Sequence, residues 1–227
     1  PQIAEDAVRV LEALGFGVQI EAPFAAGRTL ISRGLLDQAR ALAGRNLDLL
    51  EPHLAAGHRI VGLEPSETLA LRDEYLDFFD AEQHARAERL AGSVQLFEEL
   101  VAGHAPEALS GIFAGNAQAV MVHGNCHAKA LVGEDALLKS LEVAGYAPQR
   151  LATGCCGMAG SFGYDRKKYA MSMAIAEQKL FPSLRDQPDT LVCAHGFSCR
   201  HQIHDGLSRQ ARHPAELLAA VLANLPG

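Results

Sequence analysis

The sequence has no surplus of basic residues and no long apolar run. Acidic residues outnumber basic ones 27 to 20, which gives a net charge of −7 and an isoelectric point of about 5.8. This charge opposes nonspecific binding to phosphate backbones and gives no polybasic signal for lipid surfaces. No apolar run approaches the ~20 residues that span a bilayer, and no leader pattern opens the chain. We expect a folded, soluble, cytoplasmic protein that reaches a membrane only peripherally, through partners.

The sequence also lacks an initiating methionine and any low-complexity linker. It opens with Pro1 and enters an amphipathic pattern almost at once, so we expect that a preceding segment is missing. The 227 residues suffice for one or two domains that bury roughly 70% of the unfolded surface. Hydrophobic residues at 48% and charged residues at 21% are typical of globular proteins.

Helical periodicity alternates with short apolar runs along the chain. Apolar residues recur at helical spacing over residues 3–14 and 36–54, which predicts core-facing helices. Bounded apolar runs predict buried strands at residues 18–20, 60–63, 119–122 and 190–194, with another around 150–152. Strands that alternate with helices predict an α/β fold with parallel sheets flanked by helices.

The two halves of the sequence resemble each other. Residues 5–16 resemble 134–146 at an offset of 129 to 130, and an offset of 130 sets 25–27 opposite 155–157. Residues 62–67 match 194–199 at an offset of 132. We therefore expect two pseudo-repeated halves: a first repeat at 1–80, a helical connector at 81–112, and a second repeat at 113–227.

Cysteine is absent from the first 125 residues and then occurs five times. An odd, one-sided set in a chain of this kind favours metal or redox chemistry over disulfides. Four of these cysteines follow the ends of predicted strands, where ligands bind in open parallel sheets. Cys193 lies inside an apolar strand and is interpreted as a core residue. The four that can converge are Cys126, Cys155, Cys156 and Cys199.

Three kinds of chemistry fit four converging thiols. Thiolates bind iron–sulfur clusters and also structural zinc. The glycines beside the adjacent pair allow a sharp turn and the approach of a bulky group. The spacing differs from the short Cys-x2-Cys runs of ferredoxins, so a cluster here would be of an unusual type. The third hypothesis is metal-free thiols that cycle between reduced and oxidised states, which requires a lowered pKa and access.

Other polar residues near these cysteines have a structural interpretation as well as a functional one. Four histidines could bind a metal or relay protons, although each is more often a surface residue: His123, His127, His195 and His201. Three cations could offset thiolate charge or bind a substrate carboxylate, although solvated surface cations are the commoner case: Lys129, Arg166 and Arg200.

The cysteine motifs resemble the cysteine-rich "CCG" family. They read HGNCHAKAL at 123–131, GCCGMAGSFGY at 154–164 and GFSCR at 196–200, and residues 27–30, 34–36 and 62–66 resemble the first repeat of FAD-linked members. The family includes a heterodisulfide reductase subunit, the iron–sulfur subunit of glycolate oxidase, and the C-terminal region of FAD-linked D-lactate and D-2-hydroxyglutarate dehydrogenases. The resemblance implies a [4Fe-4S] cluster, cubane or noncubane, with zinc as an alternative, held by Cys126, Cys155, Cys156 and Cys199.

The sequence departs from the family pattern in two places. Gly196 stands where the family often has the first cysteine of Cys-x-x-Cys, so one ligand of that pattern is absent. In the first repeat Ala25, Ala26 and Glu67 stand at cysteine positions, and the partner of Cys126 would precede the chain. We expect no soft-metal site in this half, and Glu67 to be a solvated residue at a helix start.

The resemblance implies a C-terminal iron–sulfur electron-transfer module of an FAD-linked oxidoreductase acting on a small 2-hydroxy acid of the D-lactate, glycolate or D-2-hydroxyglutarate class. FAD would lie in a partner domain or subunit, and a further ferredoxin-like domain is another expected partner. The chain has no dinucleotide fingerprint, P-loop or Ser-His-Asp arrangement, so we expect the parent protein to be the enzyme and this chain alone to be inactive. The alternatives are a structural zinc-binding docking domain and a metal-free thiol redox module.

Overall fold

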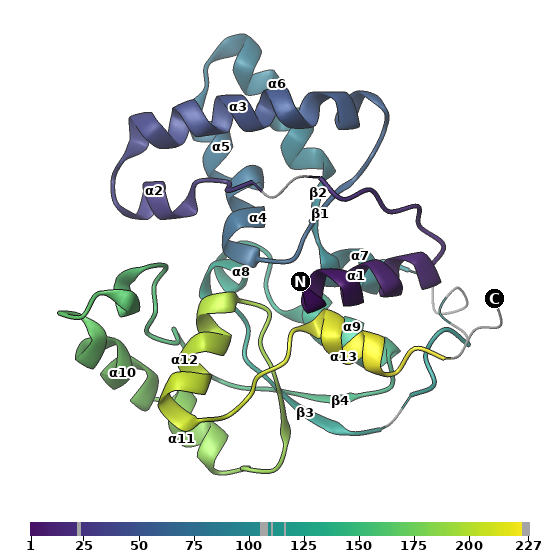
Figure 1. Ribbon diagram of the computed structural model, residues 1–227, viewed down its shortest axis with the longest axis vertical. Coiled ribbons are helices and arrows are strands. Elements are labelled where there is room, and N and C mark those ends of the chain that lie inside the picture. Colours follow the sequence, from purple (N-terminus) through teal and green to yellow (C-terminus); the bar gives the residue numbers. More distant parts are fainter. Residues whose placement is uncertain (22–23, 105–108, 110, 116, 224–227) are drawn as a thin grey trace. The chain divides into compact units, whose positions relative to one another are not determined.

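The computed structural model describes residues 1–21, 24–104, 109, 111–115 and 117–223. The chain divides into two compact units: unit 1 contains Pro1–Ile20 and Phe97–Gly227, and unit 2 contains Glu21–Leu96. Each unit holds a short parallel sheet flanked by helices (Figure 1), which confirms the predicted α/β class. Among the described residues, no helix is both long and apolar enough to cross a membrane.

A three-stranded parallel sheet organises unit 1. Its central strand β3 (Ala119–Val122) pairs with β4 (Ala147–Arg150) on one side and with β5 (Leu191–Cys193) on the other. The edge position of β4 tolerates Pro148, because an edge strand can lack one ladder N–H. Since the three strands are parallel, their carboxyl ends lie along the same edge of the sheet.

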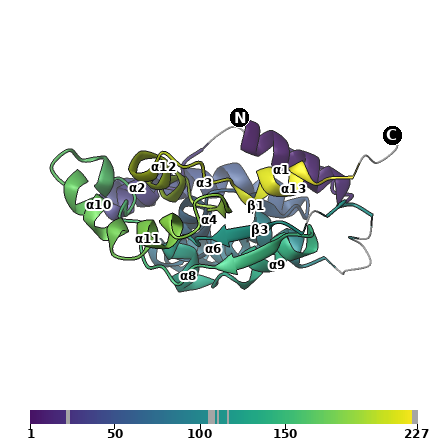
Figure 2. The same ribbon diagram turned by 90° about the horizontal axis from the view of Figure 1, so that it is seen from below.

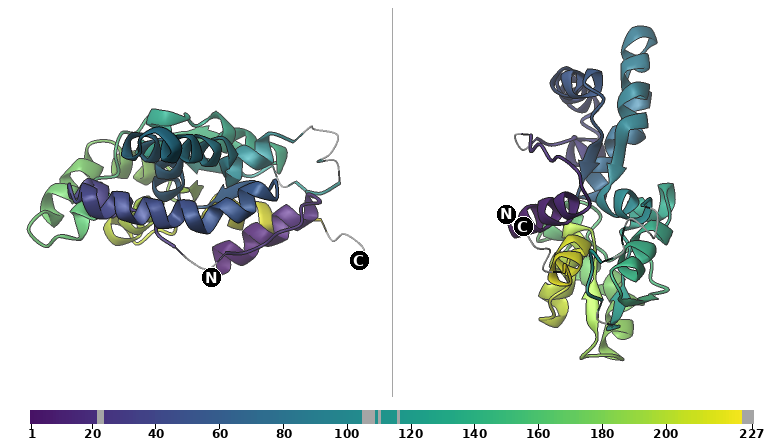
Figure 3. Two further views of the ribbon diagram at one scale, coloured as in Figure 1. Left: turned by 90° about the horizontal axis from the view of Figure 1, so that it is seen from above. Right: turned by 90° about the vertical axis from the view of Figure 1, so that its right-hand side faces the viewer.

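Helices cover both faces of this sheet. Helix α9 lies on one face, and α12 and α13 lie on the other (Figure 2 and Figure 3). Helix α1 packs against α13, and α7 packs against α9. The helices of unit 1 are α1 (Gln2–Ala13), α7 (Phe97–Ala102), α8 (Cys126–Leu131), α9 (Asp135–Val143), the 3-10 turn η2 (Phe162–Tyr164), α10 (Tyr169–Glu177), α11 (Leu180–Arg185), α12 (Phe197–Leu207) and α13 (Pro214–Ala220).

One apolar cluster links the strands of unit 1 to the cysteine loops. Met121 of β3 and Val192 of β5 pack in it with side chains from α11 and α12, such as Phe181 and Ile203. Cys156, Met158 and Cys199 belong to the same buried cluster. The loops that follow the strands are therefore anchored in the core and do not lie free on the surface.

Unit 2 has a two-stranded parallel sheet, in which Ile60 of β1 lies opposite Val94 of β2. Its longest helix, α3, buries Ala39, Ala43 and Leu47 on the face that the sequence periodicity predicts, and it packs against α6 (Figure 3). The elements of unit 2 are α2 (Arg28–Ser32), α3 (Leu36–Ala55), β1 (Ile60–Gly62), α4 (Pro65–Arg72), α5 (Glu74–Phe78), α6 (Ala81–Ser93) and β2 (Val94–Leu96).

Two local predictions are wrong, and the strand expected around residues 150–152 lies earlier in the chain, at Ala147–Arg150. Residues 18–20 form no strand; Ile20 is 72% exposed, so the apolar run is not buried. Residues 94–96, predicted as helix from the spacing of Leu90, Val94, Phe97 and Val101, form strand β2. There the helix α6 ends, and the chain extends to pair with β1. Tertiary pairing overrides a local pattern that fits a helix.

The compact units and the predicted repeats divide the chain at different positions. The unit boundaries fall after residues 20 and 96, whereas the repeats are defined at 1–80 and 113–227 with a connector between them. Residues 105–108 and 110 of that connector lie outside the described residues. The repeat division describes sequence similarity and stays a prediction.

Truncation of Leu47 is predicted to destabilise unit 2. Its side chain is 1% exposed within the core of this unit, so Leu47→Ala leaves a cavity and lowers the free energy of unfolding by about 2–5 kcal/mol. Leu36→Ala in the same helix is the control, because Leu36 is 53% exposed. Urea unfolding followed by circular dichroism measures both variants; equal midpoints would contradict the assignment of Leu47 to the core.

Candidate functional site

Four thiols gather at the carboxyl edge of the three-stranded sheet. Cys126 begins α8 after β3, the adjacent pair Cys155 and Cys156 lies in the loop after β4, and Cys199 lies in the first turn of α12 after β5. Thiol hydrogen bonding links Cys126 to Cys155, Cys155 to Cys156, and Cys156 to Cys199. The structure thus brings together all four cysteines that the sequence singled out, as one continuous row of sulfur atoms.

The row runs from the surface into the core. Cys126 is exposed, Cys155 is intermediate, and Cys156 and Cys199 are buried. Cys193 is also buried, within β5, and its thiol is not part of the hydrogen-bonded row. Burial raises the pKa of Cys193, so this thiol stays protonated.

Protons are shared unevenly along the row. Hydrogen bonding from Cys126 and Cys156 holds the pKa of Cys155 far below its usual range. Hydrogen bonding from Cys156 likewise lowers the pKa of Cys199 despite its burial, and His123 adds to this effect. Hydrogen bonding to the neighbouring sulfurs raises the pKa of Cys126 and of Cys156. The pKa is therefore lowered at Cys155 and Cys199 and raised at Cys126 and Cys156, and metal binding requires deprotonated cysteines.

His123 completes the inner end of the row. A ring nitrogen of His123 and the Sγ atoms of Cys156 and Cys199 all lie within 4.8 Å of one another. Its Nδ1 atom lies 2.7 Å from Thr153 Oγ1, while its buried Nε2 atom has no hydrogen-bond partner among the described residues. A buried unpaired nitrogen beside two sulfurs has the chemistry of a metal ligand. Sequence reasoning named this histidine but could not separate it from the other three.

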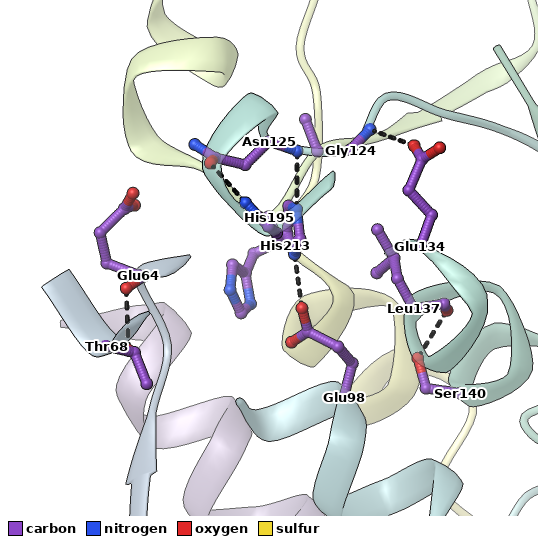
Figure 4. Close-up of polar contacts among 12 residues, drawn as sticks. Glu64, Thr68, Glu98, Gly124, Asn125, Glu134, Leu137, Ser140, His195 and His213 are labelled. Atoms are coloured by element: carbon purple, nitrogen blue, oxygen red, sulfur yellow. Dashed lines mark hydrogen bonds and ion pairs between the residues drawn. The ribbon is translucent and has the colours of Figure 1, made fainter. Parts of the chain in front are cut away.

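A buried Glu98–His195 pair fixes the loop that carries Cys126. His195 Nε2 accepts the N–H of Asn125 at 2.7 Å, so its Nδ1 carries the proton and faces Glu98 Oε1 at 2.5 Å (Figure 4). Asn125 in turn caps α8, because its Oδ1 accepts the N–H groups of His127 and Ala128. Sequence reasoning missed Glu98, since nothing in the local sequence indicates a contact with a residue 97 positions away.

Two glycines, Gly157 and Gly196, allow the cysteine loops to pack closely against neighbouring residues. Gly157 has φ +97°, and a Cβ there would lie 2.1 Å from the carbonyl oxygen of Ser172. A Cβ at Gly196 would lie 2.7 Å from Asn125 Nδ2 and 3.3 Å from Cys199 Sγ. Gly196 therefore lies close against Asn125 and the thiol of Cys199, with no room for a side chain.

The nearby cations hold the loops of the site. Lys129 Nζ donates to the carbonyl of Thr153, and Arg200 Nη1 donates to the carbonyls of Ala194 and His195. These two cations therefore fix the loops after β4 and β5. Of the other candidates, Arg166 is exposed, and His201 stacks on Phe197 with ring centroids 5.5 Å apart.

The fold and the site together define an α/β module with a convergent row of four thiols. The chain is 28% identical over 231 residues to a subunit of the anaerobic glycerol-3-phosphate dehydrogenase of Escherichia coli. The match covers 98% of this chain and 56% of that protein. It is 28% identical over 224 residues to D-2-hydroxyglutarate dehydrogenase of Escherichia coli and 31% over 203 residues to that of Pseudomonas putida, with 97% and 87% of this chain matched.

The chain spans only part of these relatives: 56% of the first, 21% of the second and 19% of the third. No family model and no solved structure matches the chain. The expected similarity to D-2-hydroxyglutarate dehydrogenases is thus found, and similarity to a glycerol-3-phosphate dehydrogenase subunit is added to it. The relatives are dehydrogenases or dehydrogenase subunits larger than this chain.

Gly157→Ala is predicted to disrupt the loop of the adjacent cysteines. The substitution forces an L residue into a left-handed conformation and against a backbone oxygen, which costs about 1–3 kcal/mol for the strain alone. Gly154→Ala is the matched control, because a Cβ there meets no atom within 4 Å. Thermal unfolding compares the two variants, and equal destabilisation would show that the loop geometry is wrong.

Glu98→Gln is predicted to remove an acid-sensitive part of the stability. Burial alone would raise the pKa of Glu98, but the contact with His195 outweighs it and lowers the pKa below its usual value of 4.5. The carboxylate therefore stabilises the fold above pH ~4.5, and this contribution is lost as the pH falls through the lower, folded-state pKa. We expect the variant to lose about 2 kcal/mol at pH 7 and to show a flatter decline below pH 5.

Urea unfolding at several values between pH 3 and pH 7 measures this difference. Glu142→Gln is the control, since Glu142 is an exposed carboxylate of α9. Parallel pH profiles for the wild type and Glu98→Gln would mean that the buried pair carries no charge.

Proposed function

We propose that this chain is the electron-transfer module of a flavin-linked dehydrogenase. Its proposed cofactor is a [4Fe-4S] cluster of cubane or noncubane type. The observation that carries the proposal is the continuous row of four thiols at one sheet edge. Similarity to dehydrogenases and dehydrogenase subunits supports it. The proposed ligands are Cys126, Cys155, Cys156 and Cys199.

The residues present fit such a cluster. Sulfur atoms are its usual ligands, and the lowered pKa of Cys155 and of Cys199 favours the thiolate form that binds a metal. The backbone N–H of Gly157 donates to Cys155 Sγ at 3.3 Å. Hydrogen bonds of this kind to ligand sulfurs tune the reduction potential of a cluster.

The proposed reaction oxidises an alcohol to a carbonyl compound, with the loss of two electrons and two protons. D-2-Hydroxyglutarate and glycerol 3-phosphate, named in the relatives, both contain a secondary alcohol. FAD in a partner domain or subunit would take the hydride, and the hydroxyl proton would go to solvent. A [4Fe-4S] cluster in this chain would carry the two electrons one at a time to a further iron–sulfur centre of the ferredoxin type.

The chain's own residues hold the sulfur atoms and control their exposure to water. Burial of Cys156 and Cys199 keeps water from the inner end of the row, whereas exposed Cys126 leaves the outer end open to a redox partner. His195 fixes the backbone at the outer end through the N–H of Asn125. The proposed direction of electron exchange is therefore through the Cys126 end.

The proposed substrate is a small 2-hydroxy acid of the D-lactate, glycolate or D-2-hydroxyglutarate class. The parent protein would be the enzyme, and this chain alone is expected to lack turnover. Of the predicted repeats at 1–80 and 113–227, only the second carries cysteines, so the proposed cluster would be held by the second repeat alone.

A structural zinc ion is the second candidate. The observation that favours it is the orphaned Nε2 of His123 beside Cys156 and Cys199. With Cys155, these residues form a Cys3His set of the kind that binds zinc tetrahedrally. Zinc would leave the domain colourless and without a redox step, so it would act in folding and docking.

Anaerobic reconstitution with iron and sulfide distinguishes the two. We expect about four iron and four sulfide per chain, as a [4Fe-4S] cluster requires, with visible absorbance that dithionite bleaches. The double variant with Cys155→Ser and Cys156→Ser should lose the bound iron and sulfide and also the visible absorbance. Cys193→Ala is the matched control and should retain the cluster, because its thiol is not part of the row.

Other outcomes would overturn the proposal. One zinc per chain without visible absorbance would support the structural zinc ion. Absence of any bound metal would favour the metal-free thiol redox module. Oxidation of a 2-hydroxy acid by this chain alone would contradict the division of labour between it and a flavin partner.

A further inference from the structure

Unit 2 contains a carboxylate at the position that matches Cys199. The sequence offsets set Glu67 opposite Cys199 and residues 25–27 opposite 155–157. Glu67 lies in the first turn of α4, as expected, but its half-buried side chain is hydrogen-bonded to the protein and not merely solvated. Its Oε2 atom accepts the backbone N–H of Ala26 at 2.6 Å and that of Gly27 at 3.1 Å. One carboxylate oxygen thus joins the start of α4 to the turn at residues 25–27.

This turn shares a left-handed glycine and a buried neighbouring residue with the cysteine turn. Gly27 and Gly157, which match at an offset of 130, both have φ +97°. Ala26 is 2% exposed and its counterpart Cys156 is 4% exposed. In the cysteine turn the N–H of Gly157 donates to a sulfur, whereas in unit 2 the N–H of Gly27 donates to a carboxylate. Equivalent amides therefore donate to a side-chain acceptor in both turns, a sulfur in unit 1 and a carboxylate in unit 2.

The carbonyl groups of the turn in unit 2 are satisfied as well. The hydroxyl of Tyr75 donates to the carbonyl of Ala26 at 2.9 Å, and Asn46 Nδ2 donates to the carbonyl of Ala25 at 2.8 Å and to the Tyr75 oxygen at 2.7 Å. Burial raises the pKa of Tyr75 to about 12, so the hydroxyl keeps its proton. The amides and carbonyls of this turn thus have partners from the protein itself.

We propose that unit 2 contains a metal-free counterpart of the cysteine site, in which the carboxylate of Glu67 accepts the turn amides and takes the place that a cysteine sulfur has in unit 1. The comparison with a metal centre rests on the proposed function. The closure of the turn by Glu67 is independent of the proposed function, because it depends only on contacts within unit 2. The turn at residues 25–27 of unit 2 therefore closes without a metal ion.

Glu67→Ala tests the carboxylate directly. Removing it leaves two amide donors without their anion, so we expect the melting temperature to fall by about 5–10 °C. Sodium acetate should restore part of the loss, whereas sodium chloride at equal ionic strength should not, because acetate carries the missing group. Leu47→Ala is the matched control: it destabilises the same unit by a cavity, and acetate should not rescue it.

Glu67→Gln is the second variant in case Glu67→Ala does not fold. Its amide oxygen can still accept both N–H groups but carries no charge, so a smaller fall in melting temperature is expected. An unchanged melting temperature in both variants, or equal rescue of Leu47→Ala by acetate, would overturn the proposal.

Metal analysis separates this proposal from the proposed function. Iron and sulfide bound by Glu67→Gln should equal those of the wild type, since Cys126, Cys155, Cys156 and Cys199 are unchanged. If the wild type binds no metal but acetate rescues Glu67→Ala, the proposed function fails while the closure by Glu67 stands. If the wild type binds a second cluster that Glu67→Gln removes, the metal-free counterpart in unit 2 is wrong.

Discussion

The parallel pairing of β3 with both β4 and β5 is the constraint on which the thiol site depends. It places the carboxyl ends of three strands along one edge, so that loops from distant parts of the chain meet there. Each loop is then fixed by its own contacts. Asn125 caps the helix of the first, Lys129 holds the second at Thr153, and Arg200 binds the carbonyls that end β5. The sheet brings the thiols together, and these contacts orient them.

Concentrating sulfur atoms in a partly buried place creates an electrostatic problem. Ionised thiols repel one another, and burial penalises each charge. Hydrogen bonds between neighbouring thiols lower the pKa of Cys155 and of Cys199 and raise the pKa of Cys126 and of Cys156. Unit 2 has the simpler situation of one carboxylate bound by two amides. A cation is therefore useful in unit 1, where thiolates accumulate, and unnecessary in unit 2.

The sequence predicts those parts of the site that follow from strand ends. The convergence of Cys126, Cys155 and Cys199 could be inferred because each follows a predicted strand in a parallel sheet. Strand β4 starts earlier than predicted because its sequence APQR has no apolar pattern. The roles of Glu98 and Glu67 could not be predicted, because each depends on one contact over 97 and about 40 positions of sequence. Such contacts require the folded backbone and leave no local signal.

Glu98 lies at the start of the second segment of unit 1, directly after the last strand of unit 2 in the sequence. It is the second residue after β2, so the chain passes from the sheet of unit 2 directly into the helix whose carboxylate holds His195. Glu98, His195 and Asn125 all belong to unit 1, so their contacts hold the backbone before Cys126 in place without a bound metal. The entropic cost of ordering the loop of Cys126 is met during folding, which favours tighter binding of a metal at the thiols.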